Sequence, residues 1–147
     1  MRKKNPAPDL DAIRKTIRDA GLRSTHARVA VLNRLQATEG PLTHAEIADE
    51  LAPFGYDRAT IYRNLVELAE AGLLSRMELG DHVWRFELRR DSEDHEADHT
   101  HFLCVDCGGV SCITGLALKT AVSLVGRRTA VGEVTEVLLK GHCKRCQ

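Results

Sequence analysis

The sequence predicts an α+β protein in two parts: a helical first half that ends in a β-hairpin, and a smaller second half of short strands around one helix. Apolar residues recur at helical spacing between capping residues over residues 9–72. A Gly-Asp pair then separates two strand-like segments, and two Cys-x2-Cys units occupy the last third. Because 43% of the 147 residues are hydrophobic, the chain can fill the cores of one or two small domains.

Two helices are expected at the start of the first half. The first runs over about residues 9–20, capped by Asp9 and ended by Gly21. The second follows Ser24 or Thr25, either of which can cap it. Both carry an apolar stripe at helical spacing, so both are expected to bury one face.

A helix-turn-helix pattern follows. Thr43 and Glu46 have the spacing of a capping box, which predicts a short helix through Leu51. A break that contains proline and glycine comes next, and Asp57 can then cap a further helix over residues 58–71. Two short helices joined by a tight break are typical of a helix-turn-helix.

A hairpin completes the first half. Its strands are expected over residues 73–79 and 82–88, joined by Gly80 and Asp81. Glycine at the first turn position favours a two-residue turn of type II′. A hairpin directly after a helix-turn-helix predicts a winged helix over residues 1–88.

The charges of the chain are unevenly distributed, although they sum to zero. Residues 1–38 carry nine Lys or Arg and three Asp, whereas residues 91–106 carry six acidic residues and no Lys or Arg. This uneven distribution favours binding of a nucleic acid by the basic N-terminal segment and of a cation by the acidic segment. The alternative is that both segments are ordinary charged surfaces in contact with solvent. No apolar run suits a signal peptide or a transmembrane helix, so a cytoplasmic protein without membrane contact is expected.

The helix expected over residues 58–71 has the side chains of a DNA-reading helix. Arg58, Tyr62 and Arg63 lie near its N-terminal end, which a recognition helix presents to the major groove. Arg23 and Arg28 are candidates for contacts with phosphates or the minor groove. The alternative is an amphipathic helix whose polar side chains face solvent only.

The cysteines predict a metal site. Two residues separate the members of each pair, so both thiolates of a pair can bind one ion from a tight turn. Four thiolates form a closed tetrahedral site suited to zinc, whereas a redox dithiol or an iron–sulfur cluster is the alternative. The intervening segment predicts a helix over residues 116–125 and a strand over residues 131–139. The four candidate ligands are Cys104, Cys107, Cys143 and Cys146.

A second group of potential ligands precedes the first cysteine pair. His99 and His101 are two residues apart, which places both imidazoles on one face of a strand. Glu87, at the end of the hairpin, can add a carboxylate, and such a set binds Zn, Fe, Mn or Ni. The alternative is a charged surface loop with incidental histidines.

The chain resembles the ferric uptake regulator family, through four segments in the family's order: residues 59–65, 83–88, 99–108 and 141–146. The resemblance implies a homodimeric repressor that binds double-stranded operator DNA when a regulatory metal is present. It divides the chain into a winged-helix DNA-binding domain over residues 1–88, a linker over 89–97 and a zinc-stapled α/β dimerisation domain over 98–147.

The resemblance also assigns roles to single residues. Tyr62 and Arg63 correspond to base-region contacts, Arg23 to a minor-groove or backbone contact, and the four paired cysteines to a structural zinc site. The regulatory ligands correspond to Glu87, His99 and His101, with the ion expected at the hinge between the two domains.

Two positions depart from the family's pattern. The family often has a histidine where Pro41 stands, and His44, three residues later, is a candidate replacement. Cys112 stands where the family has a carboxylate, and a thiol favours zinc over iron or manganese as the second divalent metal.

These features together predict a metal-dependent DNA-binding repressor of metal homeostasis, responsive to zinc or iron, rather than an enzyme. A peroxide- or redox-sensing repressor of the same family is the nearest alternative. An alternative of another class is a zinc-dependent enzyme, which needs an open metal position and a substrate pocket.

Overall fold

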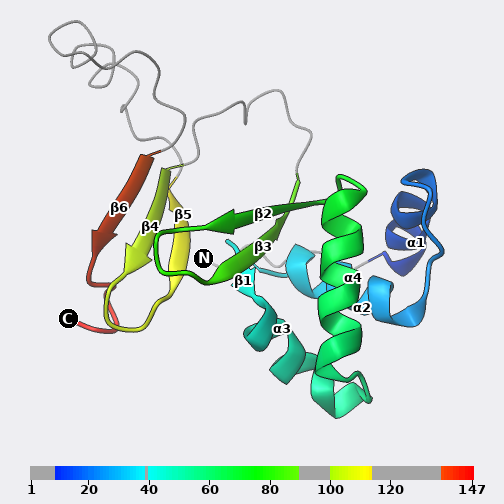
Figure 1. Ribbon diagram of the computed structural model, residues 1–147, viewed down its shortest axis with the longest axis horizontal. Coiled ribbons are helices and arrows are strands. Elements are labelled where there is room, and N and C mark those ends of the chain that lie inside the picture. The colour runs from blue at the N-terminus through cyan, green and yellow to red at the C-terminus, as the bar shows by residue number, and fades with distance from the viewer. Residues whose placement is uncertain (1–8, 39, 90–99, 114–136) are drawn as a thin grey trace, which may run out of the picture. The chain divides into compact units, whose positions relative to one another are not determined.

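The computed structural model describes residues 9–38, 40–89, 100–113 and 137–147 (Figure 1). The chain divides into two compact units, residues 1–89 and 90–147, and each is described by itself. The helix expected over residues 116–125 and His99 lie outside the described residues. Within the part that is described, no helix is long and apolar enough to cross a membrane.

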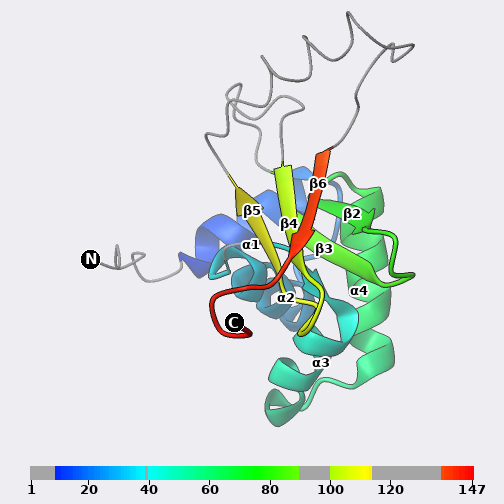
Figure 2. The same ribbon diagram turned by 90° about the vertical axis from the view of Figure 1, so that its left-hand side faces the viewer.

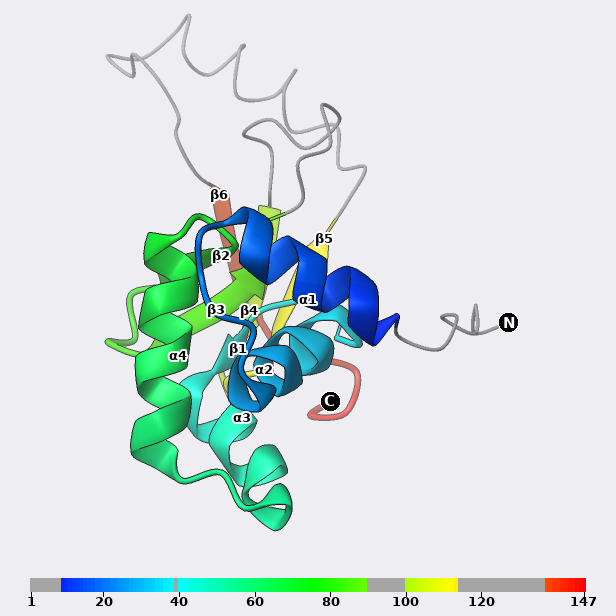
Figure 3. The ribbon, with the colours of Figure 1, turned by 90° about the vertical axis from the view of Figure 1, so that its right-hand side faces the viewer.

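Helices α1 (Leu10–Asp19) and α2 (His26–Gln36) begin at the predicted caps (Figure 3). The Asp9 carboxylate accepts hydrogen bonds from the amides of Asp11 and Ala12, at 3.1 and 3.2 Å. The Thr25 hydroxyl accepts one from the amide of Arg28 at 3.4 Å. These bonds satisfy amides that have no partner inside the helix, and so they fix where each helix starts.

Helices α3 (His44–Leu51) and α4 (Arg58–Glu70) form the predicted helix-turn-helix, with the short 3-10 helix η1 (Ala52–Phe54) between them. Both halves of the capping box are present: the Thr43 amide donates to the Glu46 carboxylate at 2.7 Å, and the Glu46 amide donates to the Thr43 hydroxyl at 3.2 Å. Gly55 has a φ of +89°, a left-handed conformation that allows the chain to turn sharply between the two helices.

The first unit also contains a three-stranded antiparallel sheet, in the order β1-β3-β2. Strands β2 (Leu74–Glu78) and β3 (Trp84–Leu88) are the predicted hairpin. Strand β1 (Leu42–Thr43) was not predicted, because two residues are too few to show an alternating pattern. It pairs with Phe86 and Arg85 of β3, and so ties the start of α3 to the sheet.

The prediction of a two-residue type II′ turn is wrong. Glu78 pairs with Trp84, which leaves residues 79–83 as a five-residue loop. The loop is held by side chains: the Glu78 carboxylate accepts from the His82 amide at 2.7 Å, and the Asp81 carboxylate accepts from the Val83 amide at 3.2 Å. These bonds replace the backbone pairing that a tighter turn would have had.

One core joins the helices and the sheet of the first unit. Its fully buried members come from α1, α2, α3, α4 and β3, so each helix buries one face against the others; among them are Ile17, Leu32, Ile47, Ile61, Leu65 and Phe86. Burying a side chain of this size contributes about 1.5–3 kcal/mol. The opposite face of α4 therefore remains available to solvent.

The second unit contains a three-stranded sheet in the order β5-β4-β6 (Figure 2). Strands β4 (Thr100–Cys104) and β5 (Val110–Ile113) are antiparallel, whereas β4 and β6 (Val137–Gly141) are parallel. The carboxyl ends of parallel strands meet at one edge of a sheet. The register pairs Cys104 with Gly141, so the turns that follow β4 and β6 start side by side.

Candidate metal centre and DNA-reading surface

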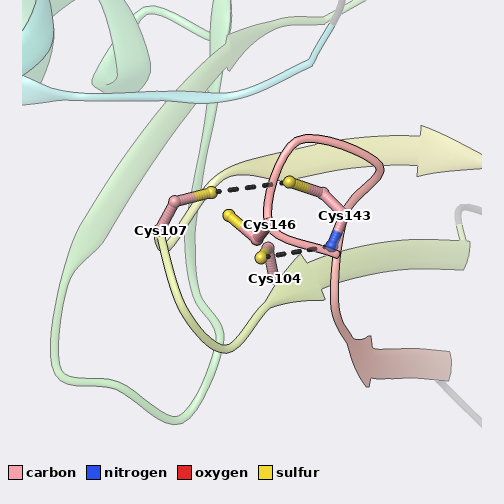
Figure 4. A group of neighbouring side chains, drawn as sticks. All are labelled: Cys104, Cys107, Cys143 and Cys146. Carbon is pink, nitrogen blue, oxygen red and sulfur yellow. Dashed lines mark hydrogen bonds between the residues drawn. The ribbon is translucent and has the colours of Figure 1, made fainter.

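The four predicted cysteine ligands gather at the carboxyl ends of β4 and β6 and in the turns that follow them (Figure 4). Their sulfur atoms all lie within 4.8 Å of one another, and the sulfurs of Cys107 and Cys143 are 3.9 Å apart. A tetrahedral zinc ion with thiolates at about 2.3 Å would separate its sulfurs by about 3.8 Å. The arrangement therefore fits one four-coordinate ion without rebuilding the backbone.

Two tight turns present these sulfurs. The Gly108 amide donates to the Cys104 carbonyl at 3.0 Å, and the Cys146 amide donates to the Cys143 carbonyl at 2.9 Å. A Cβ added at Gly109 would lie 3.3 Å from the Cys107 sulfur, so a larger residue would crowd the ligand. The absence of a side chain at Gly109 thus leaves room for the Cys107 sulfur in the site.

Backbone amides also act on the protonation of the thiols. The amides of Cys107 and Cys143 lower the pKa of Cys104 to about 6, and the Cys143 amide lies 3.3 Å from the Cys104 sulfur. The amide of Arg145 lowers the pKa of Cys143. The hydrogen bond with Cys143 raises the pKa of Cys146 to about 12, because Cys146 must keep its proton to donate it to the neighbouring sulfur. Thiolate ligands are therefore partly prepared before a metal binds.

A hydrogen-bonded pair connects the two cysteine turns. The Asp106 carboxylate lies 2.5 Å from Nδ1 of His142, and this contact raises the pKa of the imidazole. The Val105 amide also donates to the Gly141 carbonyl, at 2.9 Å. The two halves of the site are thus joined by bonds that do not involve a metal.

The candidate regulatory ligands are less completely described. His101 is 4% exposed on the central strand β4, and its register partners are Cys112 on β5 and Leu138 on β6. Glu87 is half-buried on β3 of the other unit. Among the described residues, only the four paired cysteines bring three or more ligand-bearing side chains together. The position of the Cys112 side chain lies outside what the structure describes.

The N-terminal half of α4 presents the predicted DNA-reading side chains to solvent. Arg58, Tyr62 and Arg63 are exposed, with Tyr62 at 43%. Ile61 and Leu65, on the other face, are fully buried. Arg58 forms an exposed ion pair with Asp49 of α3, and a phosphate or base that binds Arg58 would have to replace this pair. Arg23 is also exposed, in the turn between α1 and α2.

Arg28 is placed differently from the other candidate DNA contacts. Its guanidinium donates to the Arg23 carbonyl at 2.8 Å and forms an ion pair with Glu67 of α4, and its side chain is only 14% exposed. The guanidinium therefore connects α2 with α4 instead of extending into solvent. We interpret Arg28 as a residue that holds Arg23 and α4 in place.

His44 contacts the recognition helix. Its Nε2 donates to the carbonyl of Arg58 at 2.9 Å, and its ring meets the Tyr62 ring edge-on, with centroids 5.3 Å apart and planes at 65°. No sequence signal indicated this contact, because it joins residues 14 apart through a turn whose geometry only the fold sets.

A winged helix with an exposed basic recognition helix, in a chain that also holds a four-cysteine cluster, defines a DNA-binding transcriptional regulator with a metal centre. The sequence pattern of the ferric uptake regulator family matches residues 19–130. The chain belongs to the ferric uptake regulator family.

Known proteins are similar in sequence to this chain over most of its length. It is 30% identical over 135 residues to the ferric uptake regulation protein of Legionella pneumophila, covering 89% of this chain and 96% of the relative. It is 29% identical over 136 residues to the peroxide-responsive repressor PerR of Staphylococcus aureus, covering 90% and 87%. The crystal structure of the Vibrio cholerae ferric uptake regulator superposes with a TM-score of 0.70 at 25% identity, covering 88% and 98%.

Membership of this family confirms the predicted class. The chain is a metal-responsive, DNA-binding regulator and not an enzyme, and its fold is the predicted α+β architecture. Both iron-uptake and peroxide-responsive regulators are among the relatives.

Proposed function

We propose that this protein is a homodimeric repressor of metal homeostasis that carries a structural zinc ion on Cys104, Cys107, Cys143 and Cys146 and binds operator DNA when a second divalent metal is present. The gathering of four sulfurs within 4.8 Å supports the zinc site most directly. Four thiolates leave no open position for a substrate, so this ion stabilises the second unit and performs no chemistry.

DNA recognition in this proposal depends on the exposed face of α4. Arg63 is suited to a bidentate contact with guanine, and such a contact contributes about 1–3 kcal/mol of discrimination. Tyr62 can meet a thymine methyl or a phosphate, and Arg58 and Arg23 can neutralise phosphates. Exposure of all four side chains is the supporting observation.

The regulatory metal is proposed to bind through Glu87, His99 and His101, with Cys112 as a further ligand. Pairing of Cys112 with His101 across neighbouring strands is the observation in its favour. A thiol among nitrogen and oxygen ligands favours zinc over iron or manganese. His44 is omitted from this set, because its Nε2 already donates to the Arg58 carbonyl at 2.9 Å within the first unit.

Metal binding would act by a shift between conformations. An ion that binds one arrangement of the protein more tightly increases the population of that arrangement by its difference in affinity. If that arrangement spaces the two recognition helices of the dimer to match two half-sites, operator affinity rises with metal occupancy.

The test is an anaerobic titration of the zinc-loaded full-length protein with Zn, Mn, Fe(II) or Ni, in which binding to a duplex enriched from a random pool is measured. A rise of tenfold or more with zinc, lost in Cys112→Ser, is expected. A response to Mn or Fe(II) but not to Zn would contradict the zinc preference. No response to any ion would contradict metal dependence itself.

A second candidate is a repressor that senses peroxide or redox state, favoured by the similarity to PerR of Staphylococcus aureus. The same titration distinguishes it. Iron-loaded protein treated with mild peroxide would then release the duplex irreversibly, whereas zinc-loaded protein would not. Release that depends on loss of zinc from the four cysteines would indicate a thiol switch instead.

A further inference from the structure

We infer that His44 is a positioning residue for DNA recognition: it fixes the side chain of Tyr62 on the recognition helix before DNA binds. The inference rests on the proposed role of Tyr62 as a DNA contact. It assigns His44 a function different from metal ligation.

The imidazole of His44 is itself held in place. Its Nε2 donates to the Arg58 carbonyl at 2.9 Å, and Arg58 is the first residue of α4. Within a helix that carbonyl also accepts the amide four residues later, which is the amide of Tyr62. The ring is thus anchored to the turn of helix from which Tyr62 projects.

The anchored ring then restricts Tyr62. The two rings are in edge-to-face contact, with centroids 5.3 Å apart and planes at 65°, a favoured aromatic geometry. Tyr62 is 43% exposed, so without such a neighbour its ring would exchange between rotamers in solvent. Freezing a mobile side chain on binding has an entropic cost, and prior fixation removes part of that cost. We expect the gain in operator affinity to be about two- to tenfold.

Asp49 provides a comparison on the same helix pair. Its carboxylate forms an ion pair with the guanidinium of Arg58, so it also joins α3 to the first turn of α4. Within the part of the chain that the structure describes, Asp49 forms no hydrogen bond with Tyr62, whose ring contacts His44. A change at Asp49 therefore affects how α3 docks on α4 without removing the ring contact, and it serves as the matched control.

Three substitutions at His44 separate its two contacts. His44→Gln retains a donor near the Nε2 position without a ring, His44→Phe retains the ring without a donor, and His44→Ala removes both. In the full-length zinc-loaded protein we expect His44→Ala to weaken binding to the enriched duplex about two- to tenfold, with non-specific binding at equal salt unchanged. His44→Phe is expected to restore part of the loss, which a purely structural role would not predict.

Coupling to Tyr62 is measured directly. In a Tyr62→Ala background, His44→Ala should have no further effect on the enriched duplex. Fluorotyrosine labelling gives an independent readout without DNA, because the chain has two tyrosines and Tyr62→Phe assigns the signals. His44→Ala should move the Tyr62 fluorine resonance, whereas Asp49→Asn should leave it in place.

Each outcome decides the inference. An unchanged Tyr62 resonance in His44→Ala overturns it, whatever the result with DNA. Loss of the second metal equivalent in all three His44 variants would also overturn it and make His44 a ligand. If Tyr62→Ala weakens binding and His44→Ala does not, only the positioning role fails. If Tyr62→Ala leaves operator binding intact, the proposed DNA contact fails and the positioning role fails with it.

Discussion

The four thiols of the metal centre differ in proton affinity before any ion binds. Backbone amides lower the pKa of Cys104 to about 6, while the hydrogen bond with Cys143 raises the pKa of Cys146 to about 12. The difference in pKa follows from where each thiol lies. Cys104 is buried at the end of a strand, and its sulfur accepts hydrogen bonds from backbone amides of both turns. Cys146 lies in the second turn, with the other three sulfurs as its neighbours. Metal binding must displace the protons that remain.

Zinc affinity should therefore rise with pH. Protons compete with the ion for every sulfur, so affinity is expected to fall most steeply as the pH drops through about 6, where Cys104 also becomes protonated. Competition with a chromophoric chelator between pH 5.5 and 8 measures this, and a weakly buffered solution should acidify when zinc is added. Affinity that stays flat over that range would contradict the ligand assignment.

Asp81 shows how one carboxylate holds the hairpin loop. Two hydrogen bonds from the Arg85 guanidinium, at 3.0 and 2.7 Å, lower the pKa of Asp81 below its usual 3.8. The Arg85 side chain is only 5% exposed, so the cation is largely removed from water. The Asp81–Arg85 pair therefore contributes more to the free energy of unfolding than an ordinary surface ion pair does.

Asp81→Asn should lower the free energy of unfolding by about 1–3 kcal/mol at pH 7, since a charge-assisted pair near a buried guanidinium is lost. Because the folded-state pKa is depressed, this contribution is present above pH 3.8 and disappears as the pH falls through the folded value. Denaturation of both proteins from pH 3 to 7 should thus show stabilities that converge in acid. A constant difference down to pH 3 would contradict the assignment.

At the scale of elements, the best-predicted features were those with local causes. The starts of α1, α2, α3 and α4 depend on a capping side chain within three residues of the helix, and these caps can be read along the chain. The cysteine spacing predicted a site because each turn is local.

Features that depend on distant partners were missed. The two-residue strand β1 exists because β3, more than 40 positions away in the chain, pairs with it. The hairpin loop is a different case: the bonds from Glu78 and Asp81 that hold it are local, but the Gly-Asp pair also fits a tighter turn, so the pattern did not predict them. Arg28 was expected at a phosphate, although its ion pair with Glu67 connects positions 39 residues apart. No periodicity records such contacts, since they arise only when elements pack.

The bridge between α2 and α4 gives a prediction about Arg28. Arg28→Ala should lower the free energy of unfolding by about 1–3 kcal/mol, because it removes a largely buried, charge-assisted contact between two helices. The salt dependence of DNA binding should change little. Arg23→Ala is the matched control, because its exposed side chain is the proposed phosphate contact; it is expected to leave stability within about 0.5 kcal/mol and to reduce the salt slope by about one. The reverse pattern would make Arg28 a phosphate contact.

At the scale of the whole molecule, the two units depend on different sources of stability. Every member of the large core lies between Ile13 and Phe86, within the first unit. In the described part of the second unit, the buried residues all come from strand β4: Thr100, His101, Leu103 and Cys104. A bound zinc ion of this kind contributes about 10–16 kcal/mol of apparent binding energy to folding.

Removal of zinc should therefore unfold the two units unequally. After treatment with a strong chelator, hydrogen exchange is expected to accelerate by orders of magnitude in β4 and β6, while α2 and α4 keep their protection. Peptide-resolved exchange by mass spectrometry measures both regions in one sample, and re-addition of zinc is the control. Simultaneous loss of protection in both units would mean that the first unit needs the metal as well.

The parallel pairing of β4 with β6 also has a consequence for synthesis. A ribosome delivers β4, Cys104 and Cys107 well before β6, because the paired sulfurs are 36 residues apart in the chain. The core of the first unit precedes both and can collapse while the nascent chain is still growing. During that interval Cys104 and Cys107 supply only two of the four zinc ligands, and the edge of β4 that later pairs with β6 is unpaired. Capture of zinc by all four cysteines therefore requires a chain that has been translated through Cys146.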